Sequence, residues 1–342
     1  MMRLAVTYAI AGIGVAVFIA LDLPLPWLLG PIFACLIAAL CGVPMRGVKI
    51  VNDAMRSILG VAVGATFTTA ILISMAGMWT TLIMIPVMVF LIGLIGVPYF
   101  QRIWGFDFAT SYYSAMPGGL QDMLAFGEEA GGDVRALSLI HATRVMVIVV
   151  ALPFVLQGYW GVDLSNPPGA PASSLPLSQL ALMVFCGLAG WQVAKAVGMF
   201  GASILGPMLL AAIMALSGIL QFRPPAEAIW MAQFFIGMTV GTKYAGVTMG
   251  EVRKDVTAAL GFCVILIVLS LCFAEAIHLM GLAPPLETLL AFAPGGQAEM
   301  TVLALIAGAD MAFVIAHHVL RIVVVILGAP LAARFFRSKP ED

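Results

Sequence analysis

The residues best suited to chemistry occur as two matched sets. Each set starts with a Pro-Gly-Gly break, continues with an amide and a carboxylate, and ends with His-x-x-Arg. The first set is Pro117, Gly118, Gly119, Gln121, Asp122, His141 and Arg144, and the second is Pro294, Gly295, Gly296, Gln297, Glu299, His318 and Arg321. Guanidinium groups bind carboxylates, sulfonates and phosphates, and a carboxylate can hold a cation or a proton. The two sets therefore predict a binding site for a small anion and a coupling ion, with no catalytic residue.

The two sets belong to a longer internal repeat. Nine of the 28 positions from Pro117 to Arg144 are identical 177 residues later, and they include Gly131 and Asp133. Seven of these nine matches are Gly, Pro, Asp, His or Arg, and none of the seven is one of the aliphatic residues that an apolar chain repeats by chance. An internal duplication explains them better than chance.

Each break is expected to split an apolar segment into two half-helices. Proline stops the first half-helix, and the glycines permit an unwound turn and a close backbone approach. The second half-helix then starts at membrane depth, with free N–H groups and a partial positive charge at its N-terminus. Two such termini would suit an anionic group, whereas a kink that only shapes packing is the alternative.

The polar side chains allow structural and functional interpretations. Asp122 and Glu299 either cap the half-helices or bind the coupling ion, and Gln121 and Gln297 are candidate donors to a substrate. Arg144 and Arg321 either brace half-helix carbonyls and nearby carboxylates or clamp an anion. The histidines of the two His-x-x-Arg motifs either relay protons or are satisfied by hydrogen bonds.

Composition places the chain in a membrane. Hydrophobic residues make up 62% of the 342 residues, charged residues only 10%, and the mean hydropathy is +1.10. Ordinary soluble domains carry about 25% charged residues. We expect no cleavable signal peptide, because the first apolar run has a counterpart in the second half. The five cysteines lie inside apolar runs without metal spacing, so we interpret them as packing residues.

The apolar runs predict an all-α integral membrane protein with about ten transmembrane helices and two re-entrant or broken segments, arranged as two inverted-topology repeats. Residues 1–157 form the first membrane repeat, 158–176 a Pro- and Gly-rich linker, and 177–342 the second repeat. The ten full spans are expected at about 4–21, 24–43, 56–76, 79–99, 134–157, 177–197, 203–220, 228–247, 255–280 and 310–333. The split segments are expected at 106–130 and 286–307.

Positive charges favour one orientation. If each split segment enters and leaves on the same side, nearly every lysine and arginine near a span end faces the cytoplasm, and only Arg223 lies outside. Both termini are then cytoplasmic. If the split segments cross instead, Lys195, Lys243, Arg253 and Lys254 move outside. The alternative that each split segment is a broken helix that crosses the membrane is kept.

Paired glycines occur at matched positions in the two halves, as Gly60 and Gly64 and as Gly237 and Gly241. Small residues at this spacing let helices approach closely, so packing is favoured over a ligand role. Lys243 breaks the symmetry because Thr66 occupies its place in the first half. It either substitutes for a cation or extends to the cytoplasmic surface.

The tandem Pro-Gly-Gly, Asp/Glu-Met, Gly-x-Asp and His-x-x-Arg pattern resembles the AbrB duplication family of bacterial membrane proteins. The resemblance covers nearly the whole chain. It implies an inner-membrane protein with inverted repeats and interrupted helices, similar to cation/proton antiporters and anion transporters. Family members also carry ammonia monooxygenase labels, but the four histidines form no evident copper or di-iron ligand cluster.

The sequence therefore predicts an ion-coupled secondary transporter for a small organic anion, with its site at mid-membrane between the two breaks. The alternatives are a cation/proton exchanger, a non-transporting membrane regulatory protein and, least favoured, an enzyme. No cofactor or metal is expected beyond a coupling H+ or Na+. The expected partners are the solute and the lipid bilayer of the bacterial inner (plasma) membrane, with no nucleic acid. A homodimer is compatible with the sequence.

Overall fold

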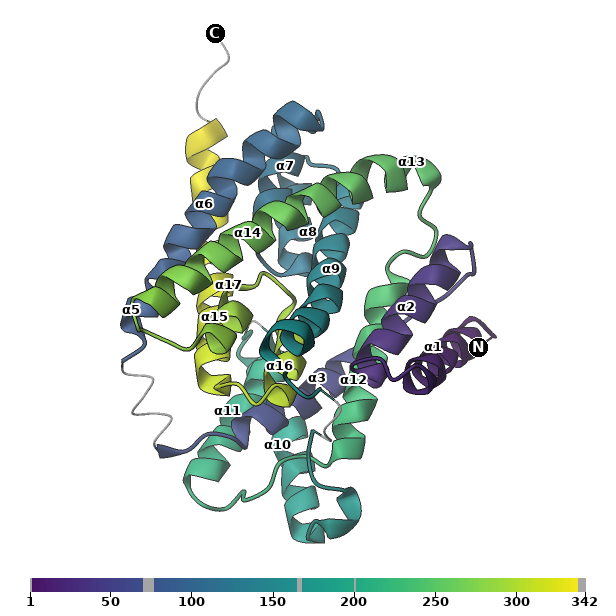
Figure 1. Cartoon of the computed structure of the whole chain (residues 1–342), viewed down its shortest axis with the longest axis vertical. Helices are drawn as coiled ribbons and strands as arrows, with labels where there is room; N and C mark the ends of the chain where they lie inside the picture. Colours follow the sequence, from purple (N-terminus) through teal and green to yellow (C-terminus); the bar gives the residue numbers. More distant parts are fainter. Residues whose placement is uncertain (1, 70–76, 165–167, 200, 338–342) are drawn as a thin grey trace. The chain divides into compact units, whose positions relative to one another are not determined.

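A computed structural model describes residues 2–69, 77–164, 168–199 and 201–337. Every regular element in these ranges is a helix, as expected (Figure 1). The helices of the first half are α1 (Met2–Ala20), α2 (Pro26–Leu40), α3 (Lys49–Gly64), α5 (Trp79–Leu82), α6 (Met84–Pro98), η1 (Tyr99–Ile103), α7 (Phe108–Ala115), α8 (Leu120–Glu129) and α9 (Val134–Trp160). After η2 (Ala172–Ser174), the second half contains α10 (Leu177–Ala196), α11 (Ala202–Leu216), α12 (Ala226–Thr242), α13 (Met249–Glu251), η3 (Val252–Val256), α14 (Thr257–Leu279), α15 (Pro285–Phe292), α16 (Gln297–Ile306) and α17 (Met311–Arg337).

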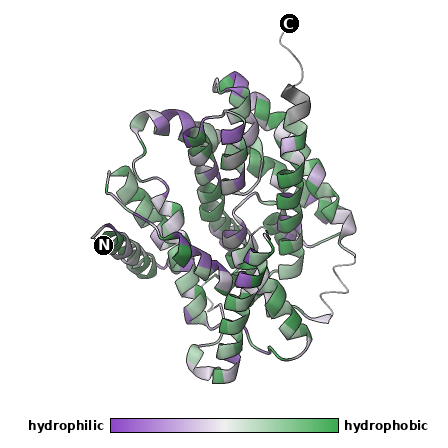
Figure 2. Cartoon of the chain, turned by 180° about the vertical axis from the view of Figure 1, so that it is seen from behind, coloured by the Kyte–Doolittle hydropathy of each residue, from purple (hydrophilic) through white to green (hydrophobic). Residues whose placement is uncertain are grey.

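Six helical segments of the described chain are long and apolar enough to cross a membrane. They are Arg3–Ala20, Trp79–Ile103, Val134–Trp160, Leu177–Ala196, Met249–Leu279 and Met311–Ala333. Figure 2 shows that the helices are coloured mostly as hydrophobic, with polar residues in short patches. The chain is therefore a helical protein of membrane type.

Four of the ten predicted spans form shorter helices. Helices α2, α3, α11 and α12 have 15 to 17 residues, whereas a crossing needs about 20. The expected span at 56–76 differs most, because α3 begins at Lys49 and ends at Gly64. Residues 70–76 of that span, residues 165–167 of the linker and residues 338–342 lie outside the described ranges. The count of ten crossings stays a prediction.

Contacts divide the chain into two compact units that do not follow the sequence halves. Unit 1 contains residues 1–76, 150–246 and 297–312, and unit 2 contains 77–149, 247–296 and 313–342. Each unit thus takes segments from both predicted repeats. The division into repeats at 1–157 and 177–342 is a statement about duplication, and it stays a prediction.

Unit 1 is held together by helices that pack across the halves, α2 with α12 and α3 with α11. The paired glycines lie at these crossings. A Cβ atom at Gly60 would lie 2.3 Å from the Ile204 carbonyl oxygen, and one at Gly237 would lie 2.3 Å from that of Leu28. Glycine is required there because any side chain would collide with the facing backbone. The structure thus shows the packing role that was favoured from sequence.

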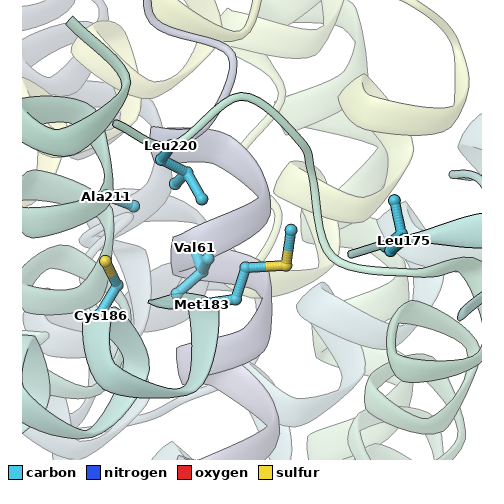
Figure 3. Packing of buried hydrophobic residues seen from close by; sticks show 6 residues of the cluster. All are labelled: Val61, Leu175, Met183, Cys186, Ala211 and Leu220. Carbon is cyan, nitrogen blue, oxygen red and sulfur yellow. The ribbon is translucent and has the colours of Figure 1, made fainter. Parts of the chain in front are cut away.

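A small apolar core marks the contact of α3 with the second half. Val61 of α3 lies in one cluster with Met183 and Cys186 of α10 and Ala211 of α11 (Figure 3). Cys186 is fully buried and has no disulfide partner. It serves as a small packing residue there, as predicted.

Unit 2 contains both breaks, and the half-helix before each break packs on a neighbouring helix. Helix α7 packs on α6, α15 packs on α14, and α6 and α14 lie side by side (Figure 1). The Tyr99 hydroxyl donates to the Ala258 carbonyl oxygen at 2.9 Å across this last contact. The surface of the unit also carries an ion pair between Arg135 and Glu251.

Candidate anion-binding site

The two breaks have the same local geometry. Helix α7 ends at Ala115 and α8 begins at Leu120, while α15 ends at Phe292 and α16 begins at Gln297. The residue after the first half-helix is extended in both cases, with φ −66° and ψ 126° at Met116 and φ −63° and ψ 126° at Ala293. The predicted half-helices are therefore present, and four non-helical residues separate the two members of each pair.

The glycines of the first break provide space and do not adopt a left-handed conformation. Gly119 has φ −64°, which any residue adopts. Gly118 is closely surrounded: a Cβ atom there would lie 2.8 Å from Met123 Cε and 2.9 Å from Val325 Cγ1. The close approach that the sequence predicted is thus made to side chains of α8 and α17.

Each arginine braces its own break through two backbone carbonyls. Arg144 donates from Nη1 to the Met116 oxygen at 3.1 Å and from Nη2 to the Gly118 oxygen at 3.0 Å. Arg321 makes the equivalent bonds, to Ala293 at 2.9 Å and to Gly295 at 3.1 Å. Each positive charge thereby meets the partial negative charge at the end of α7 or α15.

The histidines extend the same brace one turn earlier. His141 Nε2 lies 3.0 Å from the Tyr113 oxygen, and His318 Nε2 lies 2.9 Å from the Leu290 oxygen. Arg321 also donates from Nη2 to His318 Nδ1 at 3.1 Å. Since Nδ1 accepts that bond, His318 is neutral and its proton is on Nε2. The interpretation that these side chains are satisfied by hydrogen bonds therefore holds for His318.

The two guanidinium groups are buried, each 2% exposed. Arg321 lies near enough to Arg144 to be affected by its positive charge. Within the described residues, neither group has a carboxylate at ion-pair distance, although Arg135 and Glu251 do form such a pair. The pairing of arginine with Asp122 or Glu299, which the sequence allowed, is thus not observed there. The Nε atoms of both arginines are buried and have no hydrogen-bond partner among the described residues.

A row of buried polar side chains in α7 was not identified from the sequence. Ser111 and Ser114 are fully buried, and the Ser114 hydroxyl has no hydrogen-bond partner among the described residues. Alignment of the halves gives the signal that could have found this row. Ser114 corresponds to Ala291, and Tyr113 to Leu290, so the first half-helix pair is more polar than the second.

The carboxylates and amides lie at the starts of α8 and α16, as expected. Asp122 is half-buried in the first turn of α8. Glu299 is 5% exposed in the first turn of α16, a helix that packs on α3 and α12 in unit 1. Gln297 is half-buried, and the side chain of Gln121 lies outside the described part of the chain. Lys243 is an exposed residue of unit 1 that follows α12.

Comparison with known proteins identifies the family of this chain. The family described as "Transition state regulatory protein AbrB" matches residues 27–337. The chain belongs to this family. It is 28% identical over 291 residues to "Uncharacterized protein YhjN" of Bacillus subtilis (strain 168), covering 80% of this chain and 76% of that protein. It is 25% identical over 324 residues to "Putative regulator AbrB" of Escherichia coli (strain K12), covering 94% and 92%. The resemblance read from the tandem motif is thus confirmed.

Proposed function

We propose that this AbrB-family protein is an ion-coupled secondary transporter for a small organic anion, which binds in unit 2 beside the two breaks. One observation carries the proposal. Arg144 and Arg321 are both buried, the charge of Arg144 acts on Arg321, and neither has a carboxylate at ion-pair distance among the described residues. Two such charges in an apolar protein call for a counter-ion that the described side chains do not supply.

The charge balance favours an anionic solute. A buried guanidinium is costly unless it is paired, and the ends of α7 and α15 each offset only about half a charge. The Nη atoms are committed to backbone oxygens, whereas the Nε–H groups remain as buried donors. An anion that accepts from these donors would satisfy both the charge and the hydrogen bonds. A carboxylate or sulfonate has the required oxygen atoms.

The proposal also assigns the donors for the anion, the groups for the coupling ion and the topology. Helix α8 begins beside the first break without a side-chain cap, so its N–H groups are available to the anion. The carboxylates that serve the coupling ion are Asp122 in unit 2 and Glu299 in unit 1, each in the first turn of its own half-helix. The two halves form inverted-topology repeats of five crossings each in the bacterial plasma membrane, with both termini cytoplasmic. Movement of one bundle against the other exposes the site alternately to either side.

Uptake by proteoliposomes tests the proposal. Purified protein is reconstituted, and accumulation of radiolabelled acetate, pyruvate, benzoate and methanesulfonate is followed under imposed proton or sodium gradients. We expect gradient-driven accumulation of at least one anion, and loss of that coupling in Asp122→Asn and Glu299→Gln. Arg135→Gln, on the surface of the same unit, is the matched control and should retain flux. Unchanged coupled flux in both carboxylate variants would remove their proposed role.

Two other functions remain testable alternatives. The relative's name, "Putative regulator AbrB", favours a membrane regulatory protein that moves no solute. A cation/proton exchanger would use Asp122 and Glu299 directly. An exchanger would dissipate an imposed pH gradient when only Na+ or K+ is added, without any organic anion. A regulator would show neither that exchange nor anion accumulation.

A further inference from the structure

His317 is a buried histidine that the repeat does not explain. Ile140 occupies the equivalent position in the first half, so His317 takes no part in the paired braces formed by His141 and His318. Its side chain is fully buried in unit 2. The symmetric bracing therefore does not account for this buried polar group.

The side chain forms a chain of three polar contacts that ends at α5. His317 Nδ1 lies 2.7 Å from the Phe313 oxygen, and Nε2 lies 2.9 Å from the Thr81 hydroxyl. The same hydroxyl lies 2.9 Å from the Met78 oxygen. Thr81 is 1% exposed, so water does not compete for these contacts.

The number of protons available shows which protonation state of His317 fits these three contacts. The Phe313 oxygen only accepts, so Nδ1 carries a proton in every state. When His317 is neutral, Nε2 must accept from Thr81, and the hydroxyl then has no proton left for the Met78 oxygen. When His317 is protonated, Nε2 donates to Thr81 and Thr81 donates to Met78. Only the imidazolium makes all three side-chain contacts hydrogen bonds at once, while the Met78 oxygen also accepts from the Thr81 and Leu82 N–H groups, at 3.1 and 2.9 Å, in either state.

The surroundings differ from those of the neighbouring His318. The His317 ring lies 4.1 Å from the Phe313 ring centroid and 5.5 Å from that of Phe292. Aromatic rings within about 6 Å of a cation can stabilise it. His318 cannot gain a proton on Nδ1 without losing its bond from Arg321.

The charged and titratable groups around His317 oppose permanent protonation. His318 on the same helix interacts with it electrostatically, and Arg321 follows one turn later. Its contacts with α5 and α15 are to uncharged groups, the Thr81 hydroxyl and the ring of Phe292. No carboxylate is among its electrostatic neighbours in the described chain. A proton on His317 would therefore bind reversibly and add positive charge next to the arginine pair.

We propose that His317 and Thr81 form a second proton-binding site, which coupling requires in addition to the carboxylates Asp122 and Glu299, with the Thr81 hydroxyl switching between His317 Nε2 and the Met78 oxygen. This rests on the proposed transport function only for its coupling role. Proton binding adds charge beside Arg321, so it strengthens anion binding, and anion binding in turn strengthens proton binding. The protein then moves a proton and an anion in the same direction.

Nitrogen-15 NMR of histidine-labelled protein in nanodiscs tests the site without any substrate. The chain has four histidines, so the spectrum of His317→Gln identifies the His317 signal by its loss. We expect a neutral ring protonated on Nδ1 at high pH and an imidazolium at lower pH in the folded protein. Thr81→Val should move the midpoint to lower pH by about one unit, because the charged ring loses an acceptor. Thr81→Ser keeps the hydroxyl and should leave the midpoint close to wild type.

The outcomes separate this site from the transport proposal. A His317 ring that stays neutral wherever the protein is folded, or a midpoint that Thr81→Val does not move, would overturn the proton site, whatever the uptake assay shows. The coupling role is tested in the uptake assay, where His317→Gln should take up anion but lose acceleration by an inward proton gradient. Equal acceleration in His317→Gln and wild type would overturn that role. Absence of uptake in every protein would refute the transport proposal and its coupling clause, and leave the NMR result standing.

Discussion

At the scale of single residues, the most informative side chains are two arginines that do the same work in two places. Each uses both terminal nitrogens on backbone carbonyl oxygens of its own break, one oxygen before the glycine pair and one within it. Lysine cannot replace this fork, because its ammonium is a point charge without the planar geometry. Bracing and anion binding are compatible, since bracing leaves Nε for a ligand.

Replacement of Arg144 by lysine should destabilise the fold. The variant keeps the charge but loses one of two charge-assisted hydrogen bonds and leaves a buried carbonyl unsatisfied. We expect a loss of about 1.5–3 kcal/mol, and the same loss for Arg321→Lys. Arg135→Lys alters only an exposed ion pair with Glu251 and should change stability by less than about 1 kcal/mol. Thermal unfolding in one detergent, at one heating rate, measures all three. A wild-type midpoint for Arg144→Lys would contradict the brace.

Gly118 can be tested by adding a single methyl group. Gly118→Ala brings Cβ within 2.9 Å of Val325 Cγ1, and a β-branched side chain cannot move aside easily. We expect a loss of about 1–3 kcal/mol by overpacking. Gly158→Ala is the control, because a Cβ atom there meets nothing within 4 Å. The second change Val325→Ala should restore part of the loss. No gain from Val325→Ala would show that this contact does not limit the site.

At the scale of elements, the sequence predicted the breaks better than it predicted the limits of the full helices. The half-helices lie within about two residues of their expected limits, because Pro117 and Pro294 stop helices by a local rule. The observed limits of α3, Lys49 and Gly64, differ from the expected span at 56–76, and at the C-terminal end the apolar run continues beyond the end of the helix. Hydropathy alone does not detect such an end.

The candidate site, too, was predicted from the sequence only in part. Bracing by the arginines was one of two interpretations drawn from the sequence, and the carbonyl contacts now show it. The contact between His317 and Thr81 joins positions 236 residues apart, and no spacing rule indicates such a pair. The polar row in α7 was visible only by comparing Ser114 with Ala291, residue by residue.

The crossings of α3 with α11 and of α2 with α12 give an element-scale prediction. In Gly60→Ala and Gly237→Ala, the new Cβ would lie 2.3 Å from a backbone oxygen, so a whole helix must shift. We expect a loss of at least about 2–3 kcal/mol, or failure to accumulate in the membrane. Gly12→Ala in α1 is the matched control, because its Cβ would meet nothing within 4 Å. It should be neutral or stabilising by up to about 1 kcal/mol. Equal yields and midpoints for Gly12→Ala and Gly60→Ala would contradict these crossings.

At the scale of the whole molecule, the compact units and the sequence halves follow different boundaries. Helices α1 to α3 share unit 1 with α10 to α12, although the linker separates them in the chain. The buried face of α3 is covered by α11, and that of α2 by α12. A single half therefore has no partner for the helices whose glycines lie at these crossings.

This arrangement predicts how a divided chain behaves. A cut in the linker after Gly169 separates residues 1–169 from 170–342 and leaves every helix of the described chain intact. We expect each half alone to be degraded or to aggregate, because α3 in one half and α12 in the other lose the helices on which they pack. Co-expression of the two halves should restore a complex that co-purifies in detergent with a thermal midpoint near that of the intact chain.

A cut within α14 serves as the control, because it divides a helix that packs on both α6 and α15. These fragments should fail to reassemble even when they are co-expressed. A stable, monodisperse 1–169 fragment in the absence of its partner would show that a half buries its own apolar helix faces. The cross-half packing of α3 on α11 would then be dispensable for folding, and the units would be assemblies of two independently stable repeats.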